Sequence, residues 1–420
     1  KSDNLMALLA LAMARDVRRV CCYSRAVCFG TYVRAELARQ LETMGVHSPN
    51  EIQARVLPLA LSGNDVLVSS QTGSGKTLMY LLPLLERLAN GRQPLPPSPE
   101  ALAILPTPEL VVQVSSIAER LAASLPEQIT VARITGPQTV PSSFADARLI
   151  IATAEQVWQR TRDGTLSTAA LRCVAIDEAD ALLCEGAADG PEETLEDALR
   201  AHGRPQFLLA TATLSDAHEE MLMRRFTQAQ RVSHTGVLVP TLRQRFHYFR
   251  GDKDQELIKV LARAAADPWL SCGSTLVFCS SASESERVHR LLSDTLASPP
   301  RSVLLHDLLP AEVRASAVER LLAGEVEMLV ATQVAARGLD FPSLRHVIMY
   351  DLSLDVTSFV HCAGRTARRG QAGVVTCLVK SQDSKAYAHR SHHALRPAPR
   401  LNFDARGQPK PAATPGEPTS

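Results

Sequence analysis

The feature that most constrains the fold is an alternation of short aliphatic runs with helical patterns, which the chain carries twice. In the first half, the aliphatic runs lie at 65–69, 102–105, 130–134, 149–152, 173–176 and 206–210. In the second half, they lie at 275–279, 302–305, 327–331, 346–350 and 373–378, with amphipathic segments such as 283–293 and 311–322 between them. Strands that alternate with helices form parallel sheets covered by helices. The sequence therefore predicts an α/β fold with two tandem parallel-sheet domains.

The length of the chain suits two domains joined by a short linker. Its 420 residues, 45% of them hydrophobic, are enough for two buried cores and short extensions. Thr235, Gly236 and Pro240 are typical of a linker between the halves. We expect a basic N-terminal extension over 1–31, a first domain over 32–235, a linker over 236–242, a second domain over 243–390 and a disordered Pro-rich tail over 391–420.

Two further stretches have the composition of surface loops. Gly91 to Pro99 contains four prolines in nine residues, which excludes a helix or a central strand. Glu185 to Glu196 is rich in acidic residues with two glycines and a proline, and it reads as an exposed acidic loop. We expect the second loop to contribute solubility only.

Charge and cysteine content exclude several classes of protein. With 45 Lys and Arg against 44 Asp and Glu, no overall positive field attracts a nucleic acid, so any such contact must be local. The nine cysteines include no pair with the spacing of a metal site, and we expect free thiols in a reducing compartment. No apolar stretch is long enough for a membrane-spanning helix, so we expect a soluble protein without a membrane partner.

The amino-terminal region is basic. Residues 5–34 contain Arg15, Arg18, Arg19, Arg25 and Arg34 with Asp16 as their one acidic residue. This pattern resembles the end of an organellar transit region, which favours the mitochondrial matrix over the cytoplasm or the nucleolus. An ordinary basic helix explains the same pattern equally well.

A glycine-rich loop follows the first predicted strand and precedes a helix-compatible stretch. Its residues are Ser70, Gln71, Thr72, Gly73, Ser74, Gly75, Lys76 and Thr77. In such a loop the glycines let backbone N–H groups surround phosphates, the lysine neutralises the terminal phosphates and the Thr hydroxyl reaches Mg²⁺. A chance glycine-rich turn is the alternative, but the order of strand, loop and helix disfavours it. We therefore predict a phosphate-binding loop of a nucleotide site with Mg²⁺.

Two carboxylates follow a second buried strand about a hundred residues later. The run 173–176 leads into Asp177, Glu178, Ala179 and Asp180, at the carboxyl end of a strand where ligands of parallel sheets gather. We expect Asp177 to hold Mg²⁺, partly through water, and Glu178 to position and deprotonate the attacking water. Asp180 would orient neighbouring groups. An acidic helix start is the alternative, which the upstream phosphate loop makes the weaker reading.

These motifs together resemble the DEAD-box RNA helicases of helicase superfamily 2, over about residues 29 to 380. The resemblance implies two tandem RecA-like domains. Residues 45–53 are similar to the family's adenine-reading segment, so Gln53 would pair with the adenine edge through its amide. Phe29 or Tyr32 would be the aromatic ring that stacks on the base, and the spacing leaves both open.

Further motifs of the family occur in order along the chain. Thr211-Ala212-Thr213 stands where the family has Ser-Ala-Thr, and residues 335–340 nearly match its motif V, which assigns Gly338 and Asp340 to the nucleotide. Residues 361–370 match motif VI, in which Arg365 and Arg368 look like the arginine fingers that reach the γ-phosphate after domain closure. A solvated basic turn is the alternative for these arginines. By the same resemblance, the residues that couple the domains are Asp180, Thr211, Thr213 and His361.

The RNA-facing motifs depart from the family pattern. The resemblance assigns RNA contacts to Thr107, Glu109, Gly136, Thr153 and Thr332. The chain departs from the family pattern at Pro108 for an Arg, Glu155-Gln156 for Gly-Arg, Asp307 for a Gly, Gln333 for an Asp and Cys362 for an Arg. By the resemblance, Pro108, the segment 153–156 and Asp307 fall on or near the surfaces that face the RNA backbone. The lost cations predict weaker binding of the RNA backbone with a flatter salt dependence. The ATP machinery is nearly intact by comparison.

The resemblance implies an ATP-dependent RNA helicase, an RNA-stimulated ATPase that clamps, locally unwinds or remodels RNA or ribonucleoprotein. We expect single-stranded RNA or short duplexes without sequence preference as its partner, and a monomer outside a complex. The altered RNA motifs motivate a second reading, a partner-dependent or structural assembly factor in a large ribonucleoprotein such as a maturing mitochondrial ribosome. A DNA-directed relative is a third reading, and the segment around Gln53 argues against it.

Overall fold

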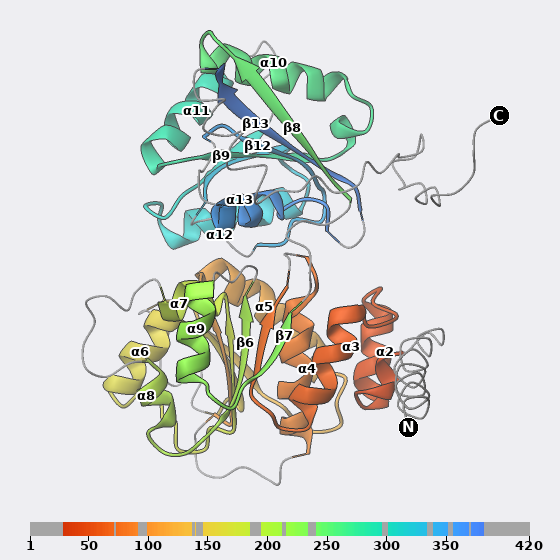
Figure 1. The fold of residues 1–420 in the computed structure, drawn as a ribbon, viewed down its shortest axis with the longest axis vertical. Coiled ribbons are helices and arrows are strands. Elements are labelled where there is room, and N and C mark those ends of the chain that lie inside the picture. The colour runs from red at the N-terminus through yellow and green to blue at the C-terminus, as the bar shows by residue number, and fades with distance from the viewer. Residues whose placement is uncertain are drawn as a thin grey trace, which may run out of the picture.

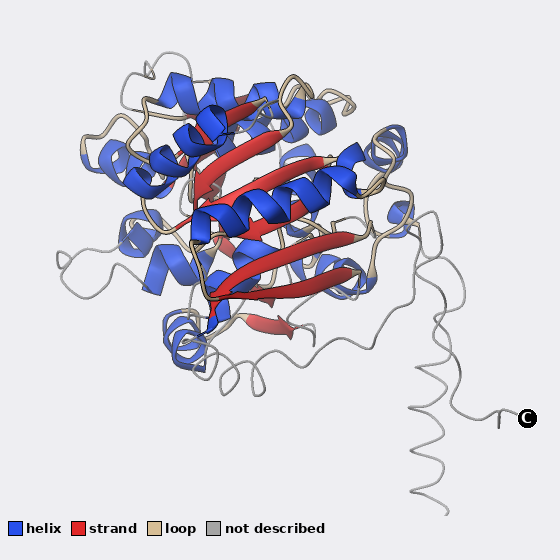
Figure 2. Cartoon of the chain, turned by 90° about the horizontal axis from the view of Figure 1, so that it is seen from above, coloured by secondary structure: helices blue, strands red, loops and turns tan. Residues whose placement is uncertain are grey.

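The computed structural model describes most of the two halves of the chain. The described residues are 28–70, 73–90, 99–136, 139, 146–184, 195–211, 216–233, 241–295, 301–333, 339–351, 356–368 and 371–381. They form two parallel β-sheets, each flanked by helices, as Figure 1 shows from the side and Figure 2 from above. This architecture confirms the predicted fold class.

The first sheet has the strand order β3-β4-β2-β5-β6-β1-β7, and every pair of neighbours is parallel. Its strands are β1 Val66–Ser69, β2 Ala101–Leu105, β3 Val131–Ile134, β4 Leu149–Thr153, β5 Cys173–Asp177, β6 Gln206–Thr211 and β7 Gln230–Ser233. Strands β1 and β5 lie on either side of β6. The ends of these three strands therefore meet at one edge of the sheet, where parallel sheets bind ligands.

Helices cover both faces of this sheet (Figure 1). The helices of the first half are η1 Phe29–Thr31, α2 Ala35–Thr43, α3 Glu51–Leu61, α4 Lys76–Ala89, α5 Pro108–Ala122, α6 Ala154–Arg162, α7 Ala179–Cys184, α8 Leu195–Arg200 and α9 Asp216–Arg225. The aliphatic runs of the strands are almost wholly buried, as expected for a sheet covered on two faces. The prediction of an acidic loop up to Glu196 was wrong at its end, because Glu196 is buried in α8 and pairs with Arg200 and Arg225.

The second sheet has the order β10-β11-β9-β12-β13-β8, and it is also parallel. Its strands are β8 Leu242–Phe249, β9 Ser274–Cys279, β10 Ser302–Leu305, β11 Met328–Thr332, β12 Leu344–Met349 and β13 Gly373–Lys380. Its helices are α10 Lys253–Ala266, η3 Leu270–Cys272, α11 Ala282–Thr295, α12 Ala311–Leu322 and α13 Val356–Ala363. Helices α12 and α13 lie on the side that faces the first half (Figure 1).

Every aliphatic run that predicted a strand forms one, within a few residues at each end. Strands β7 and β8 were not predicted as strands. β8 begins at Leu242, the last residue of the stretch expected to join the halves, whose residues 234–240 lie outside the described part. Residues 91–98, 185–194, the basic segment 1–27 and the tail 391–420 also lie outside it. Among the described helices, none combines the length and apolar character that crossing a membrane requires.

Candidate functional site

The glycine-rich loop connects β1 to α4 at the ligand-binding edge of the first sheet. Lys76 is the first residue of α4, and its ammonium donates a hydrogen bond to the Ser70 carbonyl at 2.8 Å across the loop. The Ser70 and Ser74 hydroxyls lie 2.7 Å apart, so both ends of the loop are tied together. Gln71 and Thr72 lie outside the described residues. The loop thus carries a half-buried cation at the start of a helix, the arrangement that binds phosphates.

Gln53 lies against this loop, as an adenine-reading residue must. Its side chain accepts from the Asn50 backbone N–H at 3.0 Å in a capping box of α3, and donates to the Gly75 carbonyl at 3.2 Å. Gly75 has a φ of 74°, and a Cβ there would lie 2.5 Å from Gln53 Nε2. Only glycine fits this position. The Gln53 amide keeps one N–H and one lone pair to offer a base.

The two candidate stacking rings differ in exposure. Phe29 is 2% exposed and belongs to the hydrophobic core of the first half. Tyr32 is half-buried and packs against the same core. Tyr32 is therefore the candidate ring that has exposed surface on which a base could stack.

Asp177 ends β5 and faces the helix that follows the phosphate loop. Its carboxylate accepts from the Tyr80 hydroxyl at 3.2 Å and from the Glu178 backbone N–H at 3.0 Å. Burial raises the pKa of Asp177, and the nearby Lys76 ammonium opposes that shift. The Tyr80 hydroxyl also hydrogen bonds with the Thr77 hydroxyl. Tyr80 thus connects the two side chains that sequence reasoning assigned to Mg²⁺.

Glu178 is held in an unusual backbone conformation. Its φ is 50°, in the left-handed region, and it is one of two non-glycine residues with positive φ in the described part of the chain. Such strain is typical of functional sites. The Glu178 carboxylate is buried and lies 3.9 Å from the His361 imidazole of the second half.

Asp180 is buried in the first turn of α7. Thr211 is fully buried at the end of β6, and Thr213 lies outside the described residues.

Lys76 lies among charges from both halves of the chain. Burial lowers its pKa to about 8, which the carboxylates of Asp177 and Glu178 oppose and the guanidinium groups of Arg365 and Arg368 reinforce. A partly desolvated cation next to two carboxylates and two guanidinium groups marks a site built for a highly charged ligand.

The two candidate arginine fingers lie in the turn that follows α13, which ends at Ala363. Arg365 is 2% exposed and donates from Nε to the His361 carbonyl at 2.8 Å and from Nη1 to the Leu339 carbonyl at 3.2 Å. Burial, reinforced by the neighbouring Arg368, lowers the pKa of Arg365. Arg368 donates from Nη1 to the Asp340 carboxylate at 2.9 Å. A Cβ at Gly73 would lie 3.0 Å from Arg368 Cγ, so this finger lies directly against the phosphate loop.

Asp340 is therefore occupied by Arg368 in this structure, whereas the sequence assigned it to the ribose. Gly338 lies outside the described residues. The structure brings together residues from both halves of the chain, namely Gln53, Gly75, Lys76, Asp177, Glu178, Arg365 and Arg368.

The candidate RNA-facing residues lie at the starts of helices α5 and α6. Thr107 caps α5, and its hydroxyl accepts from the Leu110 backbone N–H at 3.3 Å. Pro108 is the first residue of this helix, a position that needs no backbone N–H. Glu109 is buried and accepts from Arg314 Nε of α12 at 2.6 Å, so it contacts the other half of the chain. Pro108 thus removes a cation without disturbing the helix.

The remaining candidates lie apart from one another. The Gly136 carbonyl accepts from Arg160 Nη2 at 3.4 Å, and Thr153 precedes α6 without capping it through its side chain. Glu155, which replaces a family glycine, is exposed in the first turn of α6. Thr332 is 5% exposed, and its hydroxyl makes no hydrogen bond within the described part of the chain. A buried hydroxyl without a partner is one that a bound ligand can satisfy.

Sequence reasoning missed three residues of this region. Tyr80 reaches Asp177, Arg314 reaches Glu109, and Gln113 contacts the backbone of Asp340 on both its N–H and its C=O. Helical spacing could have placed Gln113 on the same face as Glu109, since the two are four residues apart. No sequence signal indicated that Glu109 pairs with Arg314 or that Gln113 pairs with Asp340, because these partners lie more than two hundred residues further along the chain.

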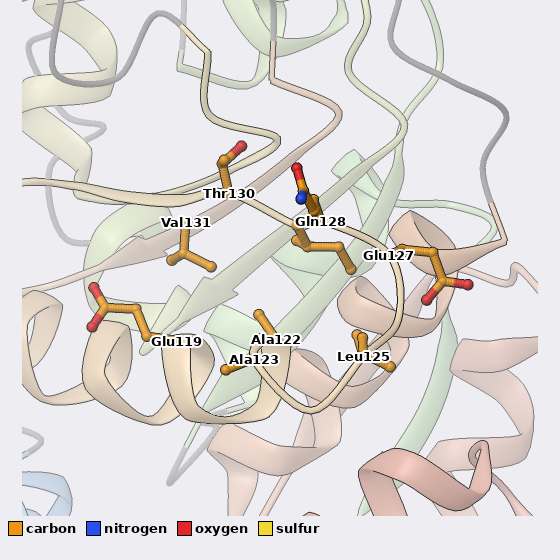
Figure 3. A pocket seen from close by; sticks show the side chains of 9 residues that line it. Glu119, Ala122, Ala123, Leu125, Glu127, Gln128, Thr130 and Val131 are labelled. Atoms are coloured by element: carbon orange, nitrogen blue, oxygen red, sulfur yellow. The ribbon is translucent and has the colours of Figure 1, made fainter.

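A cavity of about 420 Å³ lies at the opposite end of α5 from Glu109. Figure 3 shows its lining, which includes Glu119, Ala122, Leu125, Glu127 and Val131. None of the sequence-predicted site residues lines it. The nucleotide site is therefore defined by its charged side chains rather than by this cavity.

The geometry agrees with comparisons to known proteins. Residues 50–221 match the DEAD/DEAH box helicase family, and residues 252–370 match the helicase conserved C-terminal domain. The ATP-dependent RNA helicase SrmB of Haemophilus influenzae is 33% identical over 362 residues, covering 83% of this chain and 79% of that protein. The chain belongs to the DEAD-box family of ATP-dependent RNA helicases, enzymes that hydrolyse ATP and act on RNA. The resemblance found in the sequence is thereby confirmed.

Two further comparisons concern the sequence and the fold. The ATP-dependent rRNA helicase RRP3 of Gibberella zeae is 32% identical over 365 residues, which cover 84% of this chain and 71% of that protein. The structure of S. cerevisiae Dbp5 bound to RNA and ADP BeF3 superposes with a TM-score of 0.75 at 23% identity, covering 88% and 94% of the two chains. This likeness shows a shared fold, two tandem RecA-like domains.

Proposed function

We propose that this chain hydrolyses ATP between its two halves and uses the resulting closure to clamp and locally unwind RNA. One observation carries the proposal: Arg368 of the second half lies directly against the phosphate loop of the first half, where a Cβ at Gly73 would lie 3.0 Å from Arg368 Cγ. The groups that would stabilise phosphoryl transfer come from both halves of the chain, so the site is complete only when the two halves are in contact.

The nucleotide is held by the first half. Gln53 presents its remaining N–H and lone pair to the adenine edge, and Tyr32 offers a ring to the base. The loop from Gln71 to Thr77 surrounds the phosphates, with Lys76 on the terminal ones. The domain boundaries proposed for this arrangement are 32–235 for the nucleotide-binding domain and 243–390 for the domain that delivers the arginines.

The residues around Tyr80 fit a magnesium ion. Asp177 supplies a carboxylate and Thr77 a hydroxyl, the hard oxygen ligands that Mg²⁺ prefers, and both hydrogen bond with Tyr80. When bound, Mg²⁺ would neutralise phosphate charge. Asp177 would hold it partly through water, and Tyr80 keeps the two ligands together in its absence.

The reaction itself falls to Glu178 and the two arginines. Glu178 orients the attacking water and takes its proton, in a buried position that excludes other water. Arg365 and Arg368 stabilise the charge that develops on the transferred phosphoryl group. His361, 3.9 Å from Glu178, senses closure because it belongs to the second half.

RNA would bind across both halves through its backbone, without sequence preference. Thr107, Gly136, Thr153 and Thr332 are the proposed contacts, and the unsatisfied Thr332 hydroxyl supports a ligand there. Glu109 is less suited to this role because Arg314 already binds it. Pro108, Glu155 and Asp307 supply no cation, so the RNA contact is weak in the isolated chain.

This weak RNA surface favours a second candidate function, an assembly factor that acts inside a large ribonucleoprotein. Partner proteins there would supply the RNA contacts that this chain lacks. The relative named as an rRNA helicase supports a maturing ribosome as the setting. The arginines at positions 15, 18, 19 and 25 support a mitochondrial ribosome in particular. Outside such a complex we propose a monomer.

Steady-state ATP hydrolysis with and without single-stranded RNA tests the first proposal. We expect RNA to stimulate turnover and Glu178→Gln to abolish it while ATP still binds. ATP binding without RNA-stimulated turnover would overturn the first proposal in favour of the partner-dependent factor. Competition with a matched DNA strand shows whether RNA is the target.

A further inference from the structure

Helix α5 contacts the second half of the chain through two side chains on one face. Glu109 accepts from Arg314 at 2.6 Å, and one turn later Gln113 contacts Asp340. Gln113 Nε2 donates to the Asp340 carbonyl at 3.0 Å, and Gln113 Oε1 accepts from the Asp340 N–H at 3.2 Å. A side-chain amide thus pairs with both backbone groups of a single residue. This pairing fixes the position of the Asp340 backbone whatever its side chain does.

The segment that Gln113 holds is the one that supports both arginine fingers. The Asp340 carboxylate accepts from Arg368 Nη1 at 2.9 Å, and the preceding Leu339 carbonyl accepts from Arg365 Nη1 at 3.2 Å. Each finger therefore takes its position in part from residues 339 and 340. A displacement of this segment by a fraction of a hydrogen-bond length would move both guanidinium groups relative to the phosphates.

We propose that Gln113 is a positioning residue that couples the RNA-facing helix α5 to the arginine fingers through the backbone of Asp340. This inference rests on the proposed function, because it takes Arg365 and Arg368 as the fingers. The contact exists only when the two halves are closed, so it adds no stabilisation to the open chain. RNA bound at the start of α5, near Thr107, fixes the helix that carries Gln113 one and a half turns later.

The uncharged amide suits this role. A carboxylate at position 113 could still accept from the Asp340 N–H, but it would face the Asp340 carbonyl and add a negative charge beside the Asp340 carboxylate. The neighbouring Glu109–Arg314 ion pair holds the halves together without touching residues 339 and 340. Both contacts of α5 therefore favour closure, but only Gln113 also holds the segment that supports the fingers.

A double-mutant cycle between Gln113 and Arg368 tests the coupling. We expect Gln113→Ala to lower the RNA-stimulated kcat by about tenfold, the effect of losing two neutral hydrogen bonds, and Gln113→Glu to lower it at least as much. The ATP KM and the RNA-independent rate should stay within about twofold of wild type, because neither requires closure on RNA. Glu119→Ala, an exposed change on the same helix, is the matched control for helix propensity.

The combined variant gives the decisive comparison. If Gln113 acts through both fingers, adding Gln113→Ala to Arg368→Ala should lower turnover by clearly less than the loss of about tenfold that Gln113→Ala causes alone, because one of the two fingers is already absent. Multiplicative losses, or an equal loss with and without RNA, would overturn the proposal. An unchanged RNA-stimulated kcat in Gln113→Ala would do the same.

A fluorescence energy-transfer pair with one dye on each half gives a second reading that does not depend on turnover. With RNA and a non-hydrolysable ATP analogue, Gln113→Ala should lower the closed fraction, and Glu119→Ala should not. If the wild-type chain closes but shows no RNA-stimulated turnover, the proposed function fails. The closed fraction then tests by itself whether Gln113 couples α5 to the second half. An unchanged closed fraction in Gln113→Ala overturns the inference in either case.

Discussion

In the candidate nucleotide site, charged side chains of both halves surround Lys76, whose pKa burial lowers to about 8 while the neighbouring carboxylates oppose that shift. On the RNA-facing surface, the corresponding positions hold a proline at the start of α5, an exposed glutamate on α6 and an exposed aspartate before α12. Substituting Lys76 or Glu178 would remove the chemistry, whereas Pro108 and Asp307 are compatible with their local backbone. The chain therefore retains the side chains proposed for ATP turnover, whereas its RNA-facing surface lacks cations at the altered positions.

The largest expected effect belongs to the arginine fingers. Arg368→Ala removes a guanidinium that lies against the phosphate loop, and we expect RNA-stimulated kcat to fall by about 10³-fold or more. ATP affinity in the absence of RNA should change little, because the open chain does not use the finger. Phosphate release and equilibrium nucleotide binding measure the two quantities. A kcat close to wild type would show that the second half does not complete the site.

Glu178→Gln should lower turnover by about 10²- to 10⁴-fold, since the amide cannot take the proton of the attacking water. The amide has the same shape, so nucleotide binding should persist. RNA binding in the presence of ATP should become longer-lived, because hydrolysis releases the clamp. Asp163→Asn, an exposed carboxylate change in the same domain, is a suitable control. Turnover that survives in Glu178→Gln would require another base.

The pKa of Lys76 predicts a pH dependence of ATP binding. Its pKa of about 8 means that Lys76 is protonated below that pH and loses its charge above it. Because phosphates bind the charged form, affinity should be level below about pH 8 and fall by up to about tenfold per unit above it, until the pKa of the bound state is reached. Titration with a fluorescent ATP analogue measures this, and adenosine, which lacks phosphates, serves as the control. A level profile above pH 8 would mean that the site is less desolvated than the structure shows.

Introducing a cation on the RNA-facing surface should change RNA affinity by less than the other substitutions change turnover. Pro108→Arg adds one potential phosphate contact, so RNA affinity should rise several-fold at low salt and the log–log salt slope should steepen by about 0.7. Pro108→Ala controls for the loss of the proline ring. If both variants bind RNA alike, the cation at this position does not reach the backbone.

The fold was largely readable from the sequence because buried parallel strands give continuous apolar runs. Strands β7 and β8 escaped because both lie at sheet edges, where β7 has two exposed residues of four and β8 alternates Arg243, Arg245 and Tyr248 with more buried positions. Their pairing with β1 and β13 is fixed by the sheet rather than by their own composition.

Only those parts of the candidate site that belong to short, continuous sequence motifs could be predicted from the sequence. Lys76, Asp177 and Glu178 each follow a strand, so their meeting at one sheet edge could be inferred. The contacts of Gln113, Tyr80 and Glu109 could not, because each joins residues that are distant in sequence, and Gln113, Tyr80 and Arg314 carried no assigned role. Arg314, one of these partners, is an ordinary helical arginine until the two halves are placed together.

The contrast between the two surfaces is tested most directly by ATP turnover as a function of single-stranded RNA concentration, at low and at physiological salt. The account predicts that turnover reaches a clear RNA-stimulated plateau, that half-saturation needs a high RNA concentration, and that this concentration changes only weakly with salt. Tight half-saturation with a steep salt dependence would contradict the account, because it would require a full set of phosphate contacts that the RNA-facing surface does not present.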